Sequence, residues 1–223
     1  NKKISFFSIL FFPISLLVLL FIFLKRKYTK TTKFDIPIIC VGNIYVGGTG
    51  KTPTAIFLAN ELSKLRRNPV IIRKYYKKHT DEHSLIRGNF KNLILNSSRI
   101  EGIREAEKTG YDSIILDDGY QDYKIKKDLS IVCFNQNQLI GNGLVMPSGP
   151  LRESLDALNN ANIVLINGKK NIEFEKKILN INSDLDIFYS YYNPTNINQF
   201  KNKRLLAIAG IGNPGNFFKL IRE

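Results

Sequence analysis

Short apolar runs and amphipathic stretches alternate along most of this chain. The apolar runs are rich in Ile, Leu and Val and have the length of strands that are buried on both faces. They predict strands at residues 36–41, 69–72, 92–95, 111–116, 129–134, 162–166, 187–190 and 204–209. Helices are predicted at residues 53–66, 99–108 and 216–221, with a short helix within 167–183. Strands that alternate with helices predict an α/β fold with a mostly parallel sheet and helices on both faces.

Residues 4–24 interrupt this pattern with an apolar stretch of 21 residues that carries no charge. About 20 apolar residues span a bilayer as a helix, so residues 1–33 are predicted to form an N-terminal membrane helix with a basic flank. Lys25, Arg26 and Lys27 make the following flank the more basic one, which predicts that the body is cytoplasmic. Pro13 predicts a kink, so a spanning helix and an interfacial helix both stay open. A cleaved signal peptide is the alternative, but no small-residue cleavage site follows.

Residues 36–52 have the pattern of a phosphate-binding loop, in which a strand and a glycine-rich turn precede a helix. Glycines let backbone N–H groups approach phosphate, and the start of a helix favours an anion. Lys51 is predicted to reach the β- and γ-phosphates, and the Thr52 hydroxyl to contact Mg²⁺. A glycine turn without a ligand is the alternative. The predicted cofactor-binding residues are Tyr45, Val46, Gly47, Gly48, Thr49, Gly50, Lys51 and Thr52, and Tyr45 stands where the usual pattern has Gly.

Two carboxylates follow the apolar run at residues 113–116. In P-loop proteins such a strand end holds Mg²⁺ against the phosphates, so Thr52, Asp117 and Asp118 are the predicted metal ligands. Asp is also common at turns, and Asp118 could instead cap the following segment.

Residues 138–152 form a loop rich in Gly and Pro, which ends in an arginine. The planar guanidinium of Arg152 suits a phosphate. A surface arginine after a turn is an equally good interpretation of the pattern.

His79, Asp81 and His83 lie close together in the sequence. Their spacing suits no helical ligand face, and the basic residues around them repel cations, so zinc is not favoured. Asp81 is better interpreted as a general base for a hydroxyl.

The chain has 33 Lys and Arg against 19 Asp and Glu, a net charge of +14. This excess predicts an anionic partner: nucleic acid, a membrane surface or a phosphorylated substrate. AT-rich coding also produces many Lys, Asn and Ile, so charge alone leaves the question open. The two cysteines, Cys40 and Cys133, lie in apolar runs and are predicted to pack in the core.

Four motifs in order together resemble the tetraacyldisaccharide 4′-kinase family. They are Gly42-Asn43 with Val-Gly-Gly-Thr-Gly-Lys-Thr-Pro at 46–53, Asp-Asp-Gly-Tyr-Gln at 117–121, Gly-Asn-Gly at 141–143 with Pro-Ser-Gly-Pro-Leu-Arg-Glu at 147–153, and Ala-Gly-Ile-Gly-Asn-Pro at 209–214 with Phe217-Phe218. The resemblance implies a P-loop NTPase-like kinase at the cytoplasmic face of the inner membrane. Its activity would be transfer of the γ-phosphate of ATP, with Mg²⁺, to the 4′-hydroxyl of a tetraacylated disaccharide 1-phosphate in lipid A biosynthesis.

The resemblance also implies roles for individual residues. Thr80-Asp81-Glu82 matches a family motif, which makes Asp81 the carboxylate near the attacking hydroxyl. Lys51, Asp118 and Arg152 complete the predicted catalytic set, with Arg152 on a substrate or nucleotide phosphate. The residues expected to face anionic lipid or the substrate 1-phosphate are Arg73, Lys74, Lys77 and Lys78.

The expected organisation is a membrane segment at 1–33, a kinase domain at 34–209, and the start of a second, C-terminal subdomain at 210–223. The chain begins with Asn1 and ends at Glu223, and we expect it to be a fragment. The family histidine that pairs with the Asp81 carboxylate is then expected beyond residue 223.

One alternative of another class fits the same loop: a membrane-tethered P-loop ATPase or switch that binds a protein or nucleic acid. Such a protein has no need of the loop at 141–153. The expected partners are therefore a lipid disaccharide 1-phosphate and a membrane surface, and no nucleic acid.

Overall fold

A seven-stranded parallel sheet forms the centre of the computed structural model, which describes residues 4–76, 80–193, 197–200, 203–209, 215, 217, 218 and 221. The strands run in the order β3-β2-β4-β1-β5-β6-β7, and each neighbouring pair is parallel. Their bounds are β1 Ile38–Gly42, β2 Pro69–Lys74, β3 Leu93–Asn96, β4 Ser113–Asp117, β5 Leu129–Asn135, β6 Ile163–Asn167 and β7 Asp186–Ser190. The predicted α/β fold is confirmed.

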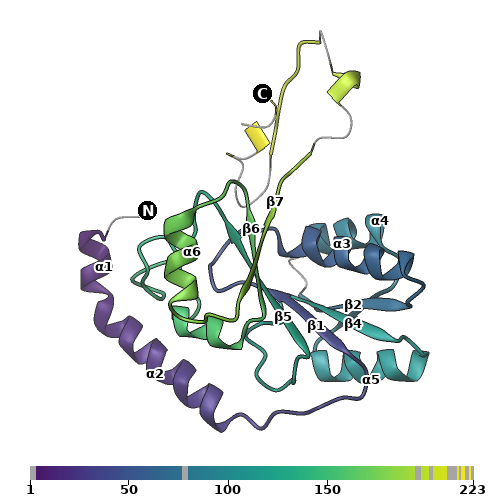
Figure 1. Cartoon of the computed structure of the whole chain (residues 1–223), viewed down its shortest axis with the longest axis horizontal. Helices are drawn as coiled ribbons and strands as arrows, with labels where there is room; N and C mark the ends of the chain where they lie inside the picture. Colours follow the sequence, from purple (N-terminus) through teal and green to yellow (C-terminus); the bar gives the residue numbers. More distant parts are fainter. Residues whose placement is uncertain are drawn as a thin grey trace.

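Helices pack on both faces of the sheet, as the apolar strands require (Figure 1). On one face lie α3 (Lys51–Lys64) and α4 (Thr80–Asn89); on the other lie α5 (Arg99–Thr109), α6 (Ile172–Leu179) and the 3₁₀-helix η1 (Leu155–Asn160). Successive strand residues point to opposite faces, so Cys40 joins the core under α5 while Val41 joins the core under α3. Cys40 and Cys133 are buried in the core, as predicted, and both thiols are free.

The N-terminal apolar stretch forms two helices, α1 (Phe6–Leu10) and α2 (Phe12–Tyr28), which lie along the outside of the molecule (Figure 1). The break falls at Phe11, with Pro13 in the first turn of α2, where a missing N–H costs little. Within the described part of the chain, none of the helices is both long and apolar enough to cross a membrane. A single spanning helix is therefore not supported.

Two serines of this stretch, Ser8 and Ser15, are buried against the protein. Ser15 is buried, and its hydroxyl lies 2.8 Å from the Val145 carbonyl oxygen, to which it donates, and 2.8 Å from the Ser148 hydroxyl. The Asn142 side-chain amide donates to the Ser8 hydroxyl at 3.2 Å. Beside these bonds the body-facing apolar residues of α2 pack on the loop at 141–151; they are Val18, Leu19 and Ile22. The apolar face that remains points outward.

Other predicted elements shifted or failed. Residues 204–209 are described without a strand, and α4 was not predicted, because its sequence is polar and has no clear apolar period. The short helix within 167–183 is present as α6. The predicted turn at 210–214 lies outside the described residues; of the predicted helix at 216–221, Phe217, Phe218 and Ile221 are described, and these are helical. The domain boundary at 210 remains a prediction.

Candidate active site

The glycine-rich loop leaves β1 at the carboxyl edge of the sheet and enters α3 at Lys51. Gly47 and Gly50 have φ angles of 124° and 91°, in the left-handed region that side chains other than glycine rarely adopt. Asn43 stabilises the loop, because its side-chain amide donates to the Thr49 hydroxyl at 2.9 Å. The first turn of α3 thus presents its free N–H groups at this edge, which favours a bound anion.

Thr52 and Asp117 meet beneath the loop. The Thr52 hydroxyl donates to Asp117 Oδ2 at 3.1 Å, and the carboxylate is fully buried. Burial raises the pKa of Asp117, and the adjacent Arg73 guanidinium opposes that shift. Asp117 Oδ1 has no hydrogen-bond partner in the described part of the chain. A hydroxyl beside a carboxylate with an unused oxygen fits Mg²⁺, which prefers oxygen ligands.

Asp118 lies next to Asp117 but has a different environment. Its φ of 56° is unusual for a residue other than glycine. Its Oδ1 lies 3.6 Å from Lys51 Nζ and 2.9 Å from Arg152 Nη1. Burial alone would raise the pKa of Asp118, but Lys51, Arg152 and Arg99 together lower it. Asp118 therefore orients two cations, and the structure brings Lys51, Asp118 and Arg152 together as the sequence analysis grouped them.

The sequence analysis did not predict that Arg73 and Arg99 lie in the candidate site. Arg73 was expected to face lipid, yet it is buried and pairs with both Asp117 and Glu82. The cause is the register of the sheet, which sets Arg73 on β2 directly beside Asp117 on β4. Arg99 donates to the backbone oxygen of Asp118 at 2.6 Å. The available signal for Arg73 was a charged residue directly after the apolar run at 69–72.

Asp81 is exposed and lies in the first turn of α4. The next residue, Glu82, reaches Arg73, so this turn lies at the same carboxyl edge as Asp117. His83 is buried and stacks on Tyr75, with ring centroids 5.6 Å apart. His79 lies outside the described residues, as do Lys77 and Lys78, and the residues that are described contain no group of three potential metal ligands among His, Cys, Asp and Glu.

The loop at 141–153 packs against the glycine-rich loop and forms backbone hydrogen bonds with the residues that lead into it. Val46 N–H donates to the Pro150 carbonyl at 2.9 Å, and Arg152 N–H donates to the Ile44 carbonyl at 2.8 Å. The Tyr45 side chain is buried against Val145 and Leu151. This packing explains why a large side chain stands where the usual pattern has Gly.

A cavity of about 530 Å³ lies beside Gly50, on the side of β1 away from Asp117. It is open between the outer surface of α3 and the strands β5, β6 and β7. Aromatic and amide side chains contribute to its lining, among them Phe57, Asn167, Phe188, Tyr191 and Tyr192. Such a cavity, mostly apolar with a few polar groups, is typical of a small-molecule site.

A parallel sheet whose central strand leads through a glycine-rich loop into a helix, with carboxylates at the end of the adjacent strand, defines a P-loop NTPase-like α/β protein. The family model described as tetraacyldisaccharide-1-P 4′-kinase matches residues 7–223. The chain belongs to this family of kinases.

Individual relatives agree. A tetraacyldisaccharide 4′-kinase of Pelagibacter ubique (strain HTCC1062) is 42% identical over 226 residues, which cover 100% of this chain and 71% of that protein. A tetraacyldisaccharide 4′-kinase of Wigglesworthia glossinidia brevipalpis is 32% identical, with 97% of this chain and 64% of the relative covered. The crystal structure of "apo" form LpxK from Aquifex aeolicus in complex with ATP has a similar fold. Its TM-score is 0.73 at 22% identity, with 96% of this chain and 78% of that chain covered.

Proposed function

We propose that this protein transfers the γ-phosphate of ATP to the 4′-hydroxyl of a tetraacyldisaccharide 1-phosphate and so forms the 1,4′-bisphosphate. The observation that carries the proposal is the convergence of Lys51 and Arg152 on Asp118 at the mouth of the glycine-rich loop. Phosphoryl transfer depends mainly on positioning and on neutralising charge. Two cations held at one point beside a helix N-terminus can supply both.

ATP would lie along the glycine-rich loop, with its phosphates on the backbone N–H groups of residues 45–52 and on Lys51. Thr52 and Asp117 would hold Mg²⁺, which supplies further positive charge to the phosphates, and Asp118 would orient Lys51 and Arg152. The cavity beside Gly50 lies on the other side of β1. We place the base of the nucleotide there, where aromatic rings can stack on it and the Asn167 amide can bind its edge.

The acceptor would enter on the Asp117 side, near the first turn of α4. Asp81 is the candidate general base because it lies in that turn, one residue before the Glu82 that binds Arg73. A sugar hydroxyl that donates a hydrogen bond to a carboxylate is held in line for attack. The contacts of Lys51 and Arg152 with Asp118 support the roles of these three residues, and the position in the first turn of α4 supports that of Asp81.

The reaction is tested by supplying ATP labelled in the γ-phosphate together with a tetraacyldisaccharide 1-phosphate in mixed micelles. We expect the label to appear in a lipid bisphosphate, and its appearance to depend on the lipid. Label that appears only as inorganic phosphate would contradict the kinase proposal and would favour an ATPase or switch.

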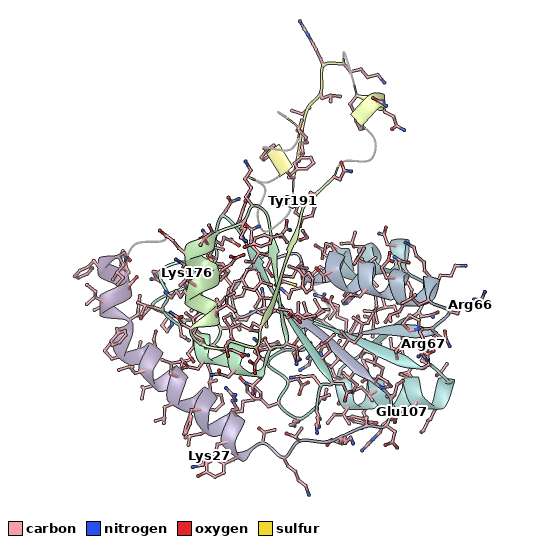
Figure 2. All side chains as sticks on the ribbon, in the orientation of Figure 1. Lys27, Arg66, Arg67, Glu107, Lys176 and Tyr191 are labelled. Carbon is pink, nitrogen blue, oxygen red and sulfur yellow. The ribbon has the colours of Figure 1, made fainter. Side chains whose placement is uncertain are left out.

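We also propose that α1 and α2 bind the interface of a membrane, at the cytoplasmic face of the inner membrane. Large apolar side chains cover the outward face, among them Phe7, Leu10, Ile14, Leu17 and Phe21. The basic residues Lys25, Arg26 and Lys27 follow in the last turn of α2 and suit anionic headgroups. Elsewhere the labelled basic residues are spread out, with Arg66 and Arg67 at the end of α3 and Lys176 on α6 (Figure 2).

The double substitution Leu17→Ser with Phe21→Ser is expected to weaken binding to anionic vesicles on the order of 10- to 100-fold, because two large apolar side chains no longer enter the lipid. Leu17 is 66% exposed and Phe21 65%, so the fold should tolerate the change. Leu65→Ser, at a 73% exposed position after α3, is the matched control and should bind as the unmodified protein does. Vesicle flotation measures both, and unchanged binding of the double variant would rule out this face as the membrane contact.

A further inference from the structure

Arg73 bridges two carboxylates that belong to different parts of the site. Its Nη1 donates to Asp117 Oδ2 and, at 3.2 Å, to the Thr52 hydroxyl, while its Nη2 donates to Glu82. The side chain is nearly buried, with the whole residue 6% exposed. A buried arginine is normally held by such a pair of charge-assisted bonds.

The position of Nη1 conflicts with the proposed metal site. Thr52 and Asp117 are the oxygen ligands that Mg²⁺ would need, and Nη1 already contacts an oxygen of each. A guanidinium only donates hydrogen bonds, so it cannot itself be a ligand. Mg²⁺ also requires close, nearly octahedral oxygen contacts, and a second cation at Asp117 Oδ2 would repel it. Asp117 Oδ1 has no hydrogen-bond partner in the described part of the chain and stays open to the ion, so the competition is one of charge: the guanidinium on Oδ2 opposes a second cation on the same carboxylate.

We propose that Arg73 is a positioning residue that neutralises Asp117 until a divalent cation replaces it there, while its bond to Glu82 persists. This inference rests on the proposed metal site at Thr52 and Asp117. Arg73 lies near the end of β2, and Glu82 lies in the first turn of α4 beside Asp81. A guanidinium that leaves Asp117 but keeps Glu82 links metal binding to the turn that carries the proposed general base.

The proposal makes one prediction that a purely structural salt bridge does not make. Without the competing guanidinium, Asp117 should bind a divalent cation more tightly in the nucleotide-free protein. Loss of a structural arginine would instead loosen the site and weaken cation binding. At the same time turnover should fall, because Glu82 no longer holds the first turn of α4 through Arg73.

The test measures Mn²⁺ binding to nucleotide-free protein by electron paramagnetic resonance, beside kcat and KM for ATP. Arg73→Gln should bind Mn²⁺ tighter by on the order of tenfold, since a unit charge beside a carboxylate shifts its affinity for a cation by about that factor, and its kcat should fall. Arg73→Lys keeps the charge but not the two-pronged geometry. It should keep the weak Mn²⁺ affinity while kcat falls with little change in KM for ATP. Arg104→Gln, at an exposed ion pair on α5, is the matched control and should change neither.

Glu82→Gln provides a second variant that leaves the buried Arg73–Asp117 pair intact, and circular dichroism reports folding of every variant. With Asp117 as its remaining carboxylate partner, Arg73 should hold it more firmly, so Mn²⁺ affinity should fall. Equal or weaker Mn²⁺ binding by folded Arg73→Gln, or unchanged binding by Glu82→Gln if Arg73→Gln does not fold, would overturn the inference. Asp117→Asn separates the two proposals: loss of Mn²⁺ binding there supports the metal site whatever Arg73 does, and no loss rejects the metal site itself.

Discussion

Lys51→Ala is expected to reduce kcat by about 10²–10³-fold, the usual effect of removing one preorganised group that stabilises transition-state charge. Lys51 is the first residue of α3, and its ammonium lies 3.6 Å from Asp118. In the proposed complex it neutralises charge that develops between the β- and γ-phosphates. The measurement is the rate of lipid phosphorylation at saturating ATP, which separates kcat from ATP affinity.

Lys64→Ala is the matched control, because Lys64 lies on the same helix but is exposed and pairs with Glu61. It should leave turnover unchanged. Circular dichroism should show that both variants fold, since Lys51 packs no part of the core. Near-normal kcat for Lys51→Ala would contradict the assignment of the phosphate-binding loop.

Asp81→Asn is expected to reduce kcat by about 10²–10⁴-fold, the typical contribution of general-base catalysis. Asparagine has nearly the same shape and can still accept a hydrogen bond, but it cannot take a proton from the sugar hydroxyl. Asp81 is exposed in the first turn of α4, so little stability should be lost. The rate is measured with the lipid acceptor.

ATP affinity is the second measurement on Asp81→Asn, and it should hardly change. Asp184→Asn is the control: Asp184 is also exposed but precedes β7, at the opposite edge of the sheet. It should leave both quantities unchanged. An Asp81→Asn variant that kept kcat and lost ATP binding would make Asp81 a nucleotide or metal contact, and the base would have to be another residue.

Local pattern was enough to predict most elements of this fold. Strands that are buried on both faces appear in the sequence as continuous apolar runs. All seven strands, β1 to β7, were predicted to within two residues at each end. The helix α4 was missed, because its sequence is largely polar and packs through few apolar residues such as Ile86. The run at 204–209 was apolar enough to predict a strand, yet the structure describes these residues without one. Whether an apolar run pairs depends on neighbours that a local pattern does not contain.

The N-terminal stretch illustrates the same limit. Its composition predicted a membrane helix. Two of its serines, Ser8 and Ser15, are buried because they form hydrogen bonds with the loop at 141–151, and these bonds define the face of the helices that contacts the protein. Ser15 binds Val145 and Ser148, residues 130 and 133 positions further along the chain. Their partners are set by packing, so the chain alone could not show which face of α2 turns to the protein.

The sequence by itself determined the fold class, the glycine-rich loop at residues 45–52 and the pair Asp117 and Asp118, because each depends on residues that are close together in the chain. Only the tertiary structure decided which charged side chains lie next to one another. It set Arg73 beside Asp117 through the register of β2 and β4, and it brought Arg152 within 2.9 Å of Asp118 through a loop that crosses the site. The physical reason is that Coulomb attraction and burial act through distance in space, and a parallel sheet brings the ends of strands that are far apart in sequence to one edge.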